Sequence, residues 1–294
     1  MGGVKTLKKK DILPIIRLAI KEDVGEGDVT SRAVVDTSLK ATAEIVSKDE
    51  GILAGIQVCA WVFHEIDRRL QITSLFCDSD ALKNDFVVQR IEGKALSILT
   101  AERTALNFLS RMSGIATQTA KMVKIICTDT AKILDTRKTA PGMRLLDKYA
   151  VCKGGGLNHR MGLWDMVLIK DNHIAAAGSI TEAVTRVRHT FRTSKKRFPV
   201  EVEVKNLEEA GEAAHLGVDR IMLDNMDIRT IRKAVIIIKQ TSEKMGKDIL
   251  IEVSGGLTEK NIKAIVQSGV DFISLGSLTH SVQAFDFSLQ ISHD

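Results

Sequence analysis

The sequence has few aromatic residues and no long apolar run. Phenylalanine, tryptophan and tyrosine make up 4% of the 294 residues, which leaves little material for a surface that stacks nucleic-acid bases. The longest apolar runs, such as residues 234–238, fall far short of the roughly 20 residues that span a bilayer. We therefore expect neither a nucleic-acid partner nor a membrane segment.

Cysteine is scarce as well, and its spacing argues against a structural zinc site. Cys59, Cys77, Cys127 and Cys152 are irregularly spaced, form no CxxC pair and have no nearby histidine at zinc-ligand spacing. We interpret them as buried or incidental thiols in a reducing compartment, and we expect a cytoplasmic location. The 42 basic and 37 acidic residues leave a charge of +5, which permits a local cationic pocket for small anions.

The first 112 residues contain helical and β-rich segments in mixed order. A helix is expected from Asp11, a strand, a helix and a strand over residues 41–75, and a further strand over residues 86–91. Residues 98–112 are strongly helical, with an apolar stripe and a polar face. That polar face meets either solvent or an anion, and it comprises Thr100, Arg103, Asn107 and Arg111.

From about residue 113 onward, short β-rich runs alternate with helical stretches. The expected strands are residues 133–134, 166–169, 200–204, 221–223, 249–253 and 272–275. The expected helices between them are residues 180–191, 207–216, 228–244 and 258–268. This alternation predicts parallel strands with crossover helices. The number of units favours an α/β barrel over an open doubly wound sheet, although periodicity alone cannot close the barrel.

Polar, charged or glycine residues stand at or after the end of each of these six strands. They are residues 135–138, residues 170–173, Glu203, residues 224–225, residues 254–256 and residues 276–277. In an α/β barrel the carboxyl ends of the strands converge on the face that carries the active site. A single charged loop residue carries little weight, but six such strand ends in succession predict a functional face.

Two kinds of charged group share this face. Positive charge comes from Arg137, Lys138, His159, Arg160 and Lys170, and arginine pairs with carboxylate or phosphate through its planar fork, so we expect anionic ligands. The carboxylates of Glu203 and Asp224 are hard donors that suit Mg²⁺ or sugar hydroxyls.

Glycines on this face suggest close contact between backbone and ligand. Residues 254–256 and 276–277 are expected to cradle phosphate, since glycine lets backbone N–H groups approach an oxyanion. Residues 154–156 are three glycines in a row, either a hinge or a place where backbone meets ligand, and the charged residues that follow favour the second. His159 has no second histidine or cysteine at ligand spacing, which argues against a metal site there.

Several segments together resemble quinolinate phosphoribosyltransferase, over nearly the whole chain. They are ILDTRKT (133–139), GGGLNHR (154–160), LIKDNHI (168–174), EDVGEGDVT (22–30), AERTALNF (101–108), EVEV (201–204), LDN (223–225), SGG (254–256) and LTHS (278–281). Ala140 and Lys153 depart from the family pattern.

The resemblance implies an α/β fold in two domains with a C-terminal segment. An N-terminal α/β sandwich domain is expected over residues 1–112, an incomplete seven-stranded α/β barrel over 113–276, and a segment packing back on the first domain over 277–294. It also implies a homodimer, or an assembly of dimers, whose active sites are shared between subunits.

The resemblance further implies the reaction of quinolinate with phosphoribosyl pyrophosphate in NAD biosynthesis, with Mg²⁺. Its implied catalytic residues are Lys138, Glu203 and Asp224, of which Glu203 and Asp224 are also the metal residues. Quinolinate is implied to bind Arg103 from the partner subunit, with Thr136, Arg137, His159, Arg160 and Lys170. The 5-phosphate is implied to bind Ser254, Gly255, Gly256, Gly276, Ser277 and Leu278.

Three other functions stay open on the sequence. A related enzyme could use another acid, such as nicotinate, with the same sugar donor. A Schiff-base lyase on the same barrel could use Lys170 as its nucleophile. A binding protein without catalytic activity is disfavoured, because both carboxylates and the cationic residues are present.

Overall fold

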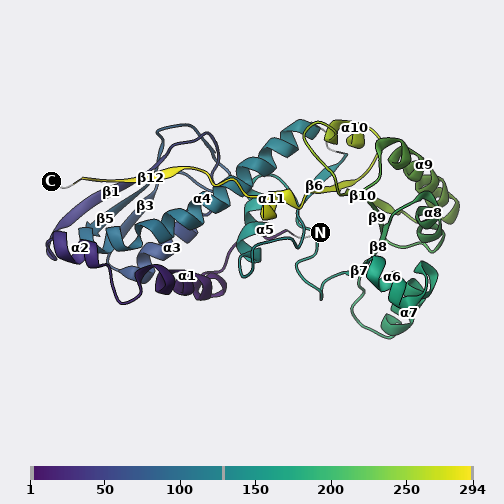
Figure 1. The fold of residues 1–294 in the computed structure, drawn as a ribbon, viewed down its shortest axis with the longest axis horizontal. Helices are drawn as coiled ribbons and strands as arrows, with labels where there is room; N and C mark the ends of the chain where they lie inside the picture. The colour runs from purple at the N-terminus through teal and green to yellow at the C-terminus, as the bar shows by residue number, and fades with distance from the viewer. Residues whose placement is uncertain (1–2, 128–129, 293–294) are drawn as a thin grey trace. The chain divides into compact units, whose positions relative to one another are not determined.

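The computed structural model describes residues 3–127 and 130–292, and the chain forms two compact units (Figure 1). The first unit takes in the residues up to 121 together with 138–156 and the residues from 277 onward. The second unit takes in residues 122–137 and 157–276. The domain boundaries expected after residues 112 and 276 stay a prediction.

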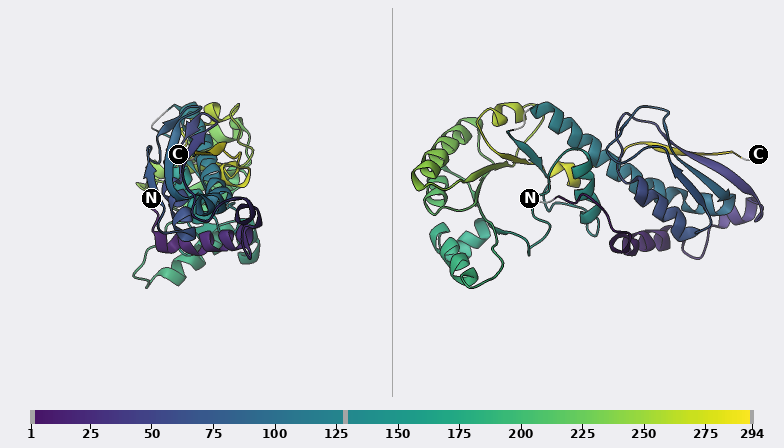
Figure 2. Two further views of the ribbon diagram at one scale, coloured as in Figure 1. Left: turned by 90° about the vertical axis from the view of Figure 1, so that its left-hand side faces the viewer. Right: turned by 180° about the vertical axis from the view of Figure 1, so that it is seen from behind.

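The first unit contains an antiparallel sheet of four strands, counted over the described residues, in the order β12-β1-β5-β3. Its strands are β1 (Lys40–Ser47), β3 (Gln71–Ser74), β5 (Val87–Lys94) and β12 (Phe287–Ser292). Alternate residues of β1, such as Ala41, Ala43 and Ile45, are buried, as a strand with one covered face requires. The C-terminal strand β12 runs alongside β1, with Phe287 paired to Ser47 (Figure 2).

The helices of the first unit include the long helix that the sequence predicts in part. They are α1 (Lys9–Val24), α2 (Val29–Val34), α3 (Ile56–Ile66), α4 (Ala95–Ile126), α5 (Arg144–Lys153) and α11 (Ser277–His280). The last turn of α4 falls in the second unit. Two short strands, β2 (Gly51–Ile52) and β4 (Ala81–Leu82), pair antiparallel with each other. Helix α4 is longer than expected, because its apolar spacing continues past residue 112 through the buried Ile115, Ala116 and Met122.

The polar face of α4 meets protein groups at some positions and solvent at others. The guanidinium of Arg111 donates two hydrogen bonds to the buried carboxylate of Asp147, at 2.9 and 2.8 Å. Arg103 and Asn107 are exposed. The sequence analysis allowed two partners for this face, solvent or an anion. At Arg111 the partner is an anionic group of the same chain, the carboxylate of Asp147.

The second unit contains a parallel sheet of six strands, counted over residues 130–292, in the order β6-β11-β10-β9-β8-β7. Its strands are β6 (Lys132–Leu134), β7 (Val167–Ile169), β8 (Val200–Val204), β9 (Arg220–Asp224), β10 (Leu250–Ser254) and β11 (Phe272–Ser274). Its helices are α6 (Asp171–Ala177), α7 (Ile180–Phe191), α8 (Leu207–His215), α9 (Ile228–Met245) and α10 (Ile262–Val266). Figure 1 shows α7, α8 and α9 along one side of this sheet.

The α/β class, with an antiparallel N-terminal and a parallel C-terminal sheet, is confirmed. Leu157 adds an isolated parallel bridge to Leu134, so the parallel set reaches seven segments when this single bridge is counted. Within the described ranges, no helix is both long and apolar enough to cross a membrane.

Candidate active site

The carboxyl ends of several parallel strands lie at one level of the sheet. Ser254 pairs with Asp224 on one side and with Ser274 on the other, and Ser274 pairs with Leu134. Residues that follow these strands therefore emerge at the same edge. The structure brings these strand ends together as the sequence predicts.

One face of the sheet also carries charged residues below that edge. Side chains alternate between faces along a strand, so Glu201 and Glu203 share a face of β8. Glu203 pairs with Met222, and Met222 pairs with Glu252, which places the two glutamates on the same face. The opposite face carries apolar residues such as Val202, which is fully buried.

Asp135 anchors the segment that carries His159 and Arg160. It is fully buried directly after β6 and accepts a hydrogen bond from the Asn158 side chain at 2.6 Å and from the His159 backbone N–H at 2.9 Å. The backbone of Leu157 hydrogen-bonds to β6 as well, at 2.8 Å to the carbonyl of Ile133. Residues 157–160 are therefore held against the end of β6.

Arg137 and Arg160 are half-buried cations close to one another. Partial burial, and then the positive charge of Arg137, lowers the pKa of Arg160 from its usual value. The Arg160 guanidinium also donates to the carbonyl of Met166 at 3.3 Å. Two guanidiniums that repel each other in a partly dry site favour a bound anion.

Lys170 and Glu203 form a direct ion pair. Lys170 stands at the N-cap of α6, directly after β7, and its ammonium contacts the carboxylate of Glu203 near the end of β8. The Glu203 side chain is 9% exposed and that of Lys170 is 41% exposed. The structure therefore brings together two residues that the sequence assigned to different ligands.

The loop after β10 makes a close approach that requires glycine. Gly255 has a φ of +84°, and a Cβ atom there would lie 2.2 Å from Oδ1 of Asn225. The Asn225 backbone N–H donates to the carbonyl of Ser254 at 2.9 Å, and its side chain donates to Asp224 at 3.1 Å. The loops after β9 and β10 thus pack against each other around Asp224.

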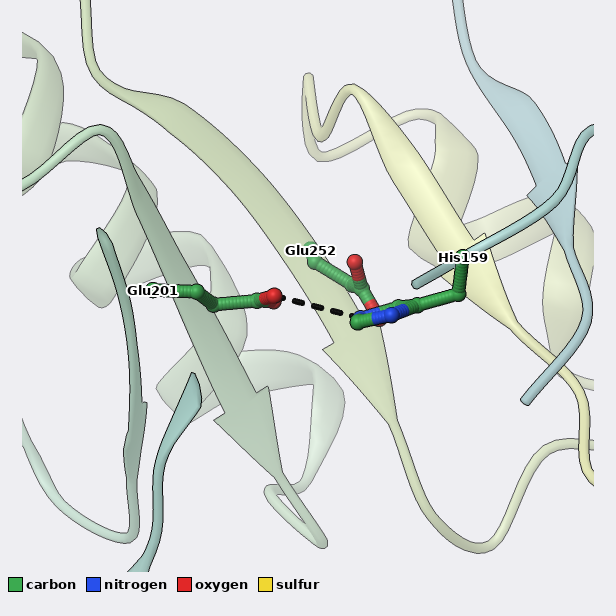
Figure 3. A group of neighbouring side chains, drawn as sticks. All are labelled: His159, Glu201 and Glu252. Atoms are coloured by element: carbon green, nitrogen blue, oxygen red, sulfur yellow. Dashed lines mark ion pairs between the residues drawn. The ribbon is translucent and has the colours of Figure 1, made fainter. Parts of the chain in front are cut away.

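Three buried side chains form a cluster that the sequence did not reveal. Figure 3 shows Glu201 and Glu252 pointing toward the ring of His159. The Nε2 atom of His159 lies 3.1 Å from Glu201 and 3.6 Å from Glu252, and both glutamates are fully buried. Burial raises the pKa of both carboxyl groups, and the neighbouring Glu201 raises that of Glu252 further.

The spacing of this cluster would also suit a metal ion, since one ligand atom from each residue lies within 4.8 Å of the others. The hydrogen bonding of the ring argues against one. The Arg160 backbone N–H donates to Nδ1 of His159 at 2.7 Å, so Nδ1 carries no proton. Nε2, which faces the glutamates, then carries the ring proton and has no lone pair for a metal.

Four further predicted site residues belong to the first unit. Arg103 is exposed on α4, and Lys138 is exposed with its carbonyl accepting from the Thr279 hydroxyl at 2.8 Å. Ser277 begins α11, and Leu278 is 1% exposed. Their relation to the strand ends of the second unit stays a prediction, as do the assigned roles of Thr136 and Gly276.

Two residues of the glycine triplet pack closely against helix α4. A Cβ atom on Gly154 would lie 2.3 Å from the carbonyl oxygen of Ala116, and one on Gly156 would lie 2.8 Å from the side chain of Thr119. These two glycines are buried against α4, whereas Gly155 is exposed with a φ of +87°, and contact of the triplet with a ligand stays a prediction. Gly154 and Gly156 permit close packing of the chain on the helix.

Two family models match the chain in succession. The model described as the N-terminal domain of quinolinate phosphoribosyl transferase matches residues 28–113, and that of the C-terminal domain matches residues 115–290. The chain belongs to the quinolinate phosphoribosyltransferase family. The resemblance stated from sequence motifs is therefore confirmed.

Individual relatives agree with this family. A mitochondrial quinolinate phosphoribosyltransferase [decarboxylating] of Nicotiana tabacum is 41% identical over 96% of this chain and 82% of its own length. A probable nicotinate-nucleotide pyrophosphorylase [carboxylating] of Bacillus subtilis is 41% identical over 92% of this chain and 90% of its own. The solved nicotinate-nucleotide pyrophosphorylase of Francisella tularensis is 40% identical, with a TM-score of 0.91 over 99% of this chain and 100% of that one.

A more distant structure shares the fold alone. The human nicotinic acid phosphoribosyltransferase is 13% identical, with a TM-score of 0.61 over 95% of this chain and 73% of that one. Such a likeness carries no information about the acid that this family member uses.

Proposed function

We propose that this family member transfers the phosphoribosyl group of phosphoribosyl pyrophosphate to quinolinate, giving nicotinate mononucleotide, pyrophosphate and carbon dioxide for NAD biosynthesis. The observation that carries the choice of acid is the pair of half-buried guanidiniums of Arg137 and Arg160. Two adjacent cations in a partly desolvated pocket are compensated best by a ligand with two carboxylates.

The proposed dicarboxylate site combines residues from two subunits. Within one subunit, Arg137 and Arg160 pair with the ring carboxylates, and Lys170 leaves Glu203 to join them. Charge-assisted contacts of this kind orient the pyridine ring as well as bind it. The full proposed set is Arg103 of the partner subunit, Thr136, Arg137, His159, Arg160 and Lys170.

The sugar donor is proposed to lie against the neighbouring strand ends. Lys138, Glu203 and Asp224 act around the ribose and the pyrophosphate. The 5-phosphate lies against residues 254–256 and 276–278, where backbone N–H groups at glycine can approach its oxygens. Gly255 and Gly256 both have a positive φ and neither is buried, which supports this part of the proposal.

Mg²⁺ is proposed to join the donor at Glu203 and Asp224. Mg²⁺ is usually held by one or two carboxylates and completes its octahedron with substrate phosphates and water, which fits this pair. The bound ion would neutralise charge on the departing pyrophosphate. Lys170 contacts one carboxylate oxygen of Glu203 in the structure, so this ammonium would compete with an ion bound at Glu203.

The chemistry needs positioning and charge stabilisation rather than a covalent nucleophile. The pyridine nitrogen bonds to the anomeric carbon as the bond to the pyrophosphate oxygen breaks, through an oxocarbenium-like state. The nitrogen then carries positive charge, so the carboxylate on the adjacent carbon leaves as carbon dioxide. Its electron pair stays on that carbon, stabilised by the charged nitrogen, and a proton adds there.

Assembly and location are part of the same proposal. We expect a homodimer or an assembly of dimers, as the family resemblance implies, with Arg103 of α4 supplied by the partner subunit. A cytoplasmic location is proposed from the four irregularly spaced cysteines. The relative from Nicotiana tabacum is named as mitochondrial and one from Arabidopsis thaliana as chloroplastic.

Release of labelled carbon dioxide tests the proposed reaction. Quinolinate labelled in the carboxylate next to the ring nitrogen is incubated with the protein and Mg²⁺, with and without phosphoribosyl pyrophosphate. We expect labelled carbon dioxide only when the donor is present. Release without the donor, or donor consumption without release, would contradict the proposal.

The Schiff-base alternative is tested by borohydride trapping. The ammonium of Lys170 is engaged in an ion pair with Glu203, so it is not positioned to attack a carbonyl carbon. We therefore expect no substrate adduct on Lys170 after reduction. A trapped adduct, identified by mass spectrometry, would support the lyase instead.

A further inference from the structure

Both ring nitrogens of His159 are directed at groups of the protein itself. Nδ1 accepts a hydrogen bond from the Arg160 backbone N–H at 2.7 Å, so the ring proton is on Nε2. Nε2 lies 3.1 Å from a carboxylate oxygen of Glu201 and 3.6 Å from one of Glu252 (Figure 3). The imidazole side chain is 5% exposed, so it offers little surface to a substrate.

The two glutamates are themselves held in place. Glu252 accepts a hydrogen bond from the guanidinium of Arg220 at 2.7 Å, and the guanidinium carbon lies 4.2 Å from the ring centroid of Phe272. Glu201 is fully buried on β8, on the same face as Glu203. A buried carboxyl group is costly unless a polar group lies beside it, and the Nε2 atom of His159, 3.1 Å from Glu201, attracts this carboxylate electrostatically without a well-aligned hydrogen bond.

We propose that Glu201 and Glu252 are positioning residues for the dicarboxylate, and that they act through His159. They fix the imidazole as its Nε2–H tautomer, which leaves Nδ1 to accept the Arg160 backbone N–H. The ring thereby holds the Arg160 backbone at the end of the segment anchored by Asp135. This inference rests on the proposed role of Arg160 in binding quinolinate, and it replaces direct contact of His159 with the substrate by an indirect role.

The tautomer of His159 is measured first, in the unmodified protein. Protein labelled with ¹⁵N at histidine gives ring nitrogen shifts that distinguish a protonated from an unprotonated Nδ1, and His159→Gln identifies the signals of this residue. We expect protonated Nε2 and unprotonated Nδ1. A protonated Nδ1 on His159 would overturn the proposal.

Substitution of Glu201 then tests the effect on substrate binding. Glu201→Leu removes the carboxylate, while Glu201→Gln keeps a carbonyl oxygen that can accept from Nε2–H. We expect the leucine variant to raise the quinolinate KM about tenfold, with kcat and the KM of the sugar donor within about twofold of wild type. The glutamine variant should recover most of the quinolinate affinity. Thermal melts identify any variant that does not fold.

The control substitution removes a buried hydroxyl elsewhere in the same unit. Thr241 is buried on α9, and Thr241→Val should leave the KM values for quinolinate and for the sugar donor unchanged. An unchanged quinolinate KM in folded Glu201→Leu, or an equal rise in both KM values, would overturn the proposal. A folded Arg160→Ala variant with a wild-type quinolinate KM would instead refute the proposed role of Arg160 in binding quinolinate. The tautomer of His159 is measured separately and does not depend on that result.

Discussion

At the scale of single residues, the ion pair between Lys170 and Glu203 connects two proposed binding sites. Lys170 is assigned to quinolinate and Glu203 to the sugar donor and its metal, yet each partners the other in the structure. A carboxylate paired with an ammonium is a weaker metal ligand than one without a cation beside it. Binding of a dianion beside Lys170 would compete for the ammonium and leave Glu203 available to the metal.

Asp224 is the residue whose replacement should harm catalysis most directly. It is only partly buried at the end of β9 and accepts a hydrogen bond from its neighbour Asn225, so we expect its replacement to affect stability little. We expect Asp224→Ala to lower kcat/KM on the order of a hundredfold or more, with the melting temperature nearly unchanged. The exposed Glu208→Ala on α8 is the matched control and should retain activity. Near wild-type turnover of Asp224→Ala at saturating Mg²⁺ and donor would refute its assignment.

The sequence predicted the charged residues at strand ends but missed Glu201, Arg220 and Glu252. Alternation such as VEVEV over residues 200–204 ordinarily indicates a strand with one solvent-facing side. In this sheet both faces are covered, so the alternating glutamates and arginine are at most 2% exposed at these three positions. The available signal was Glu201, a second glutamate two residues before Glu203 and therefore on the same face of the strand. Its neighbours His159 and Glu252 lie on other segments, so sequence spacing could not identify them.

At the scale of secondary-structure elements, Asp67 joins the end of α3 to the start of α4. Its carboxylate accepts from the Arg69 side chain at 2.8 and 2.9 Å and from the Ser97 hydroxyl at 3.0 Å. These bonds, chiefly those from Arg69, hold the pKa of Asp67 well below its usual value. The stability that they contribute is therefore present above the unfolded pKa of about 4 and is lost as the pH falls below it.

This linkage predicts how Asp67→Asn behaves as the pH changes. The variant should be less stable than wild type at pH 7, because its side chain cannot pair with Arg69 as a charged group. The difference in unfolding free energy should shrink as the pH falls below about 4, because the Asp67 carboxylate of the unfolded wild-type chain then binds a proton that the folded state does not. Denaturant unfolding at a series of pH values measures it. A difference that stays constant with pH would contradict this origin.

The loop between β10 and α10 should tolerate no side chain at Gly255. Both the φ of +84° and the contact at 2.2 Å with Asn225 force the backbone to move in Gly255→Ala. We expect the KM of the sugar donor to rise several-fold while that of quinolinate changes little. Gly178→Ala is the control, since it shares a positive φ of 102° but has open space around it. Equal effects of both variants on the donor KM would contradict a phosphate-binding role of the loop.

Element types were predictable where the pattern was long, and boundaries were not. The six expected parallel strands are present, because β-branched residues bounded by polar turns leave little choice. The expected helix over residues 258–268 is confined to Ile262–Val266. Asn261 accepts from the Thr258 backbone N–H and donates to the carbonyl of Gly256, which stabilises a turn in place of the first helical turn.

At the scale of the whole molecule, shared active sites predict complementation between inactive subunits. Arg103→Ala and Lys138→Ala should each be nearly inactive alone. A mixed dimer would have one site with both residues intact, so an equal mixture after exchange should recover up to about a quarter of wild-type activity. The activity of the mixture, measured after subunit exchange is demonstrated, tests this arrangement.

A second mixture provides the control for that experiment. Lys138→Ala and Glu203→Ala remove residues that the proposal assigns to the same subunit of each site, so their mixture should stay inactive. Persistent inactivity of the Arg103 and Lys138 mixture after exchange would contradict the contribution of Arg103 from a partner subunit.

Selection of a dicarboxylate over a monocarboxylate is the central claim, and kcat/KM for quinolinate and nicotinate at one fixed salt concentration measures it. Nicotinate would leave one of the crowded cations without its carboxylate, and a lost charge-assisted contact is worth roughly 1.5 to 3 kcal/mol, or about ten- to a hundredfold. We therefore predict at least about tenfold preference for quinolinate, and we predict that Arg137→Ala narrows this preference mainly by weakening quinolinate. Comparable values for the two acids in the wild-type protein would show that the cations serve the sugar phosphates instead.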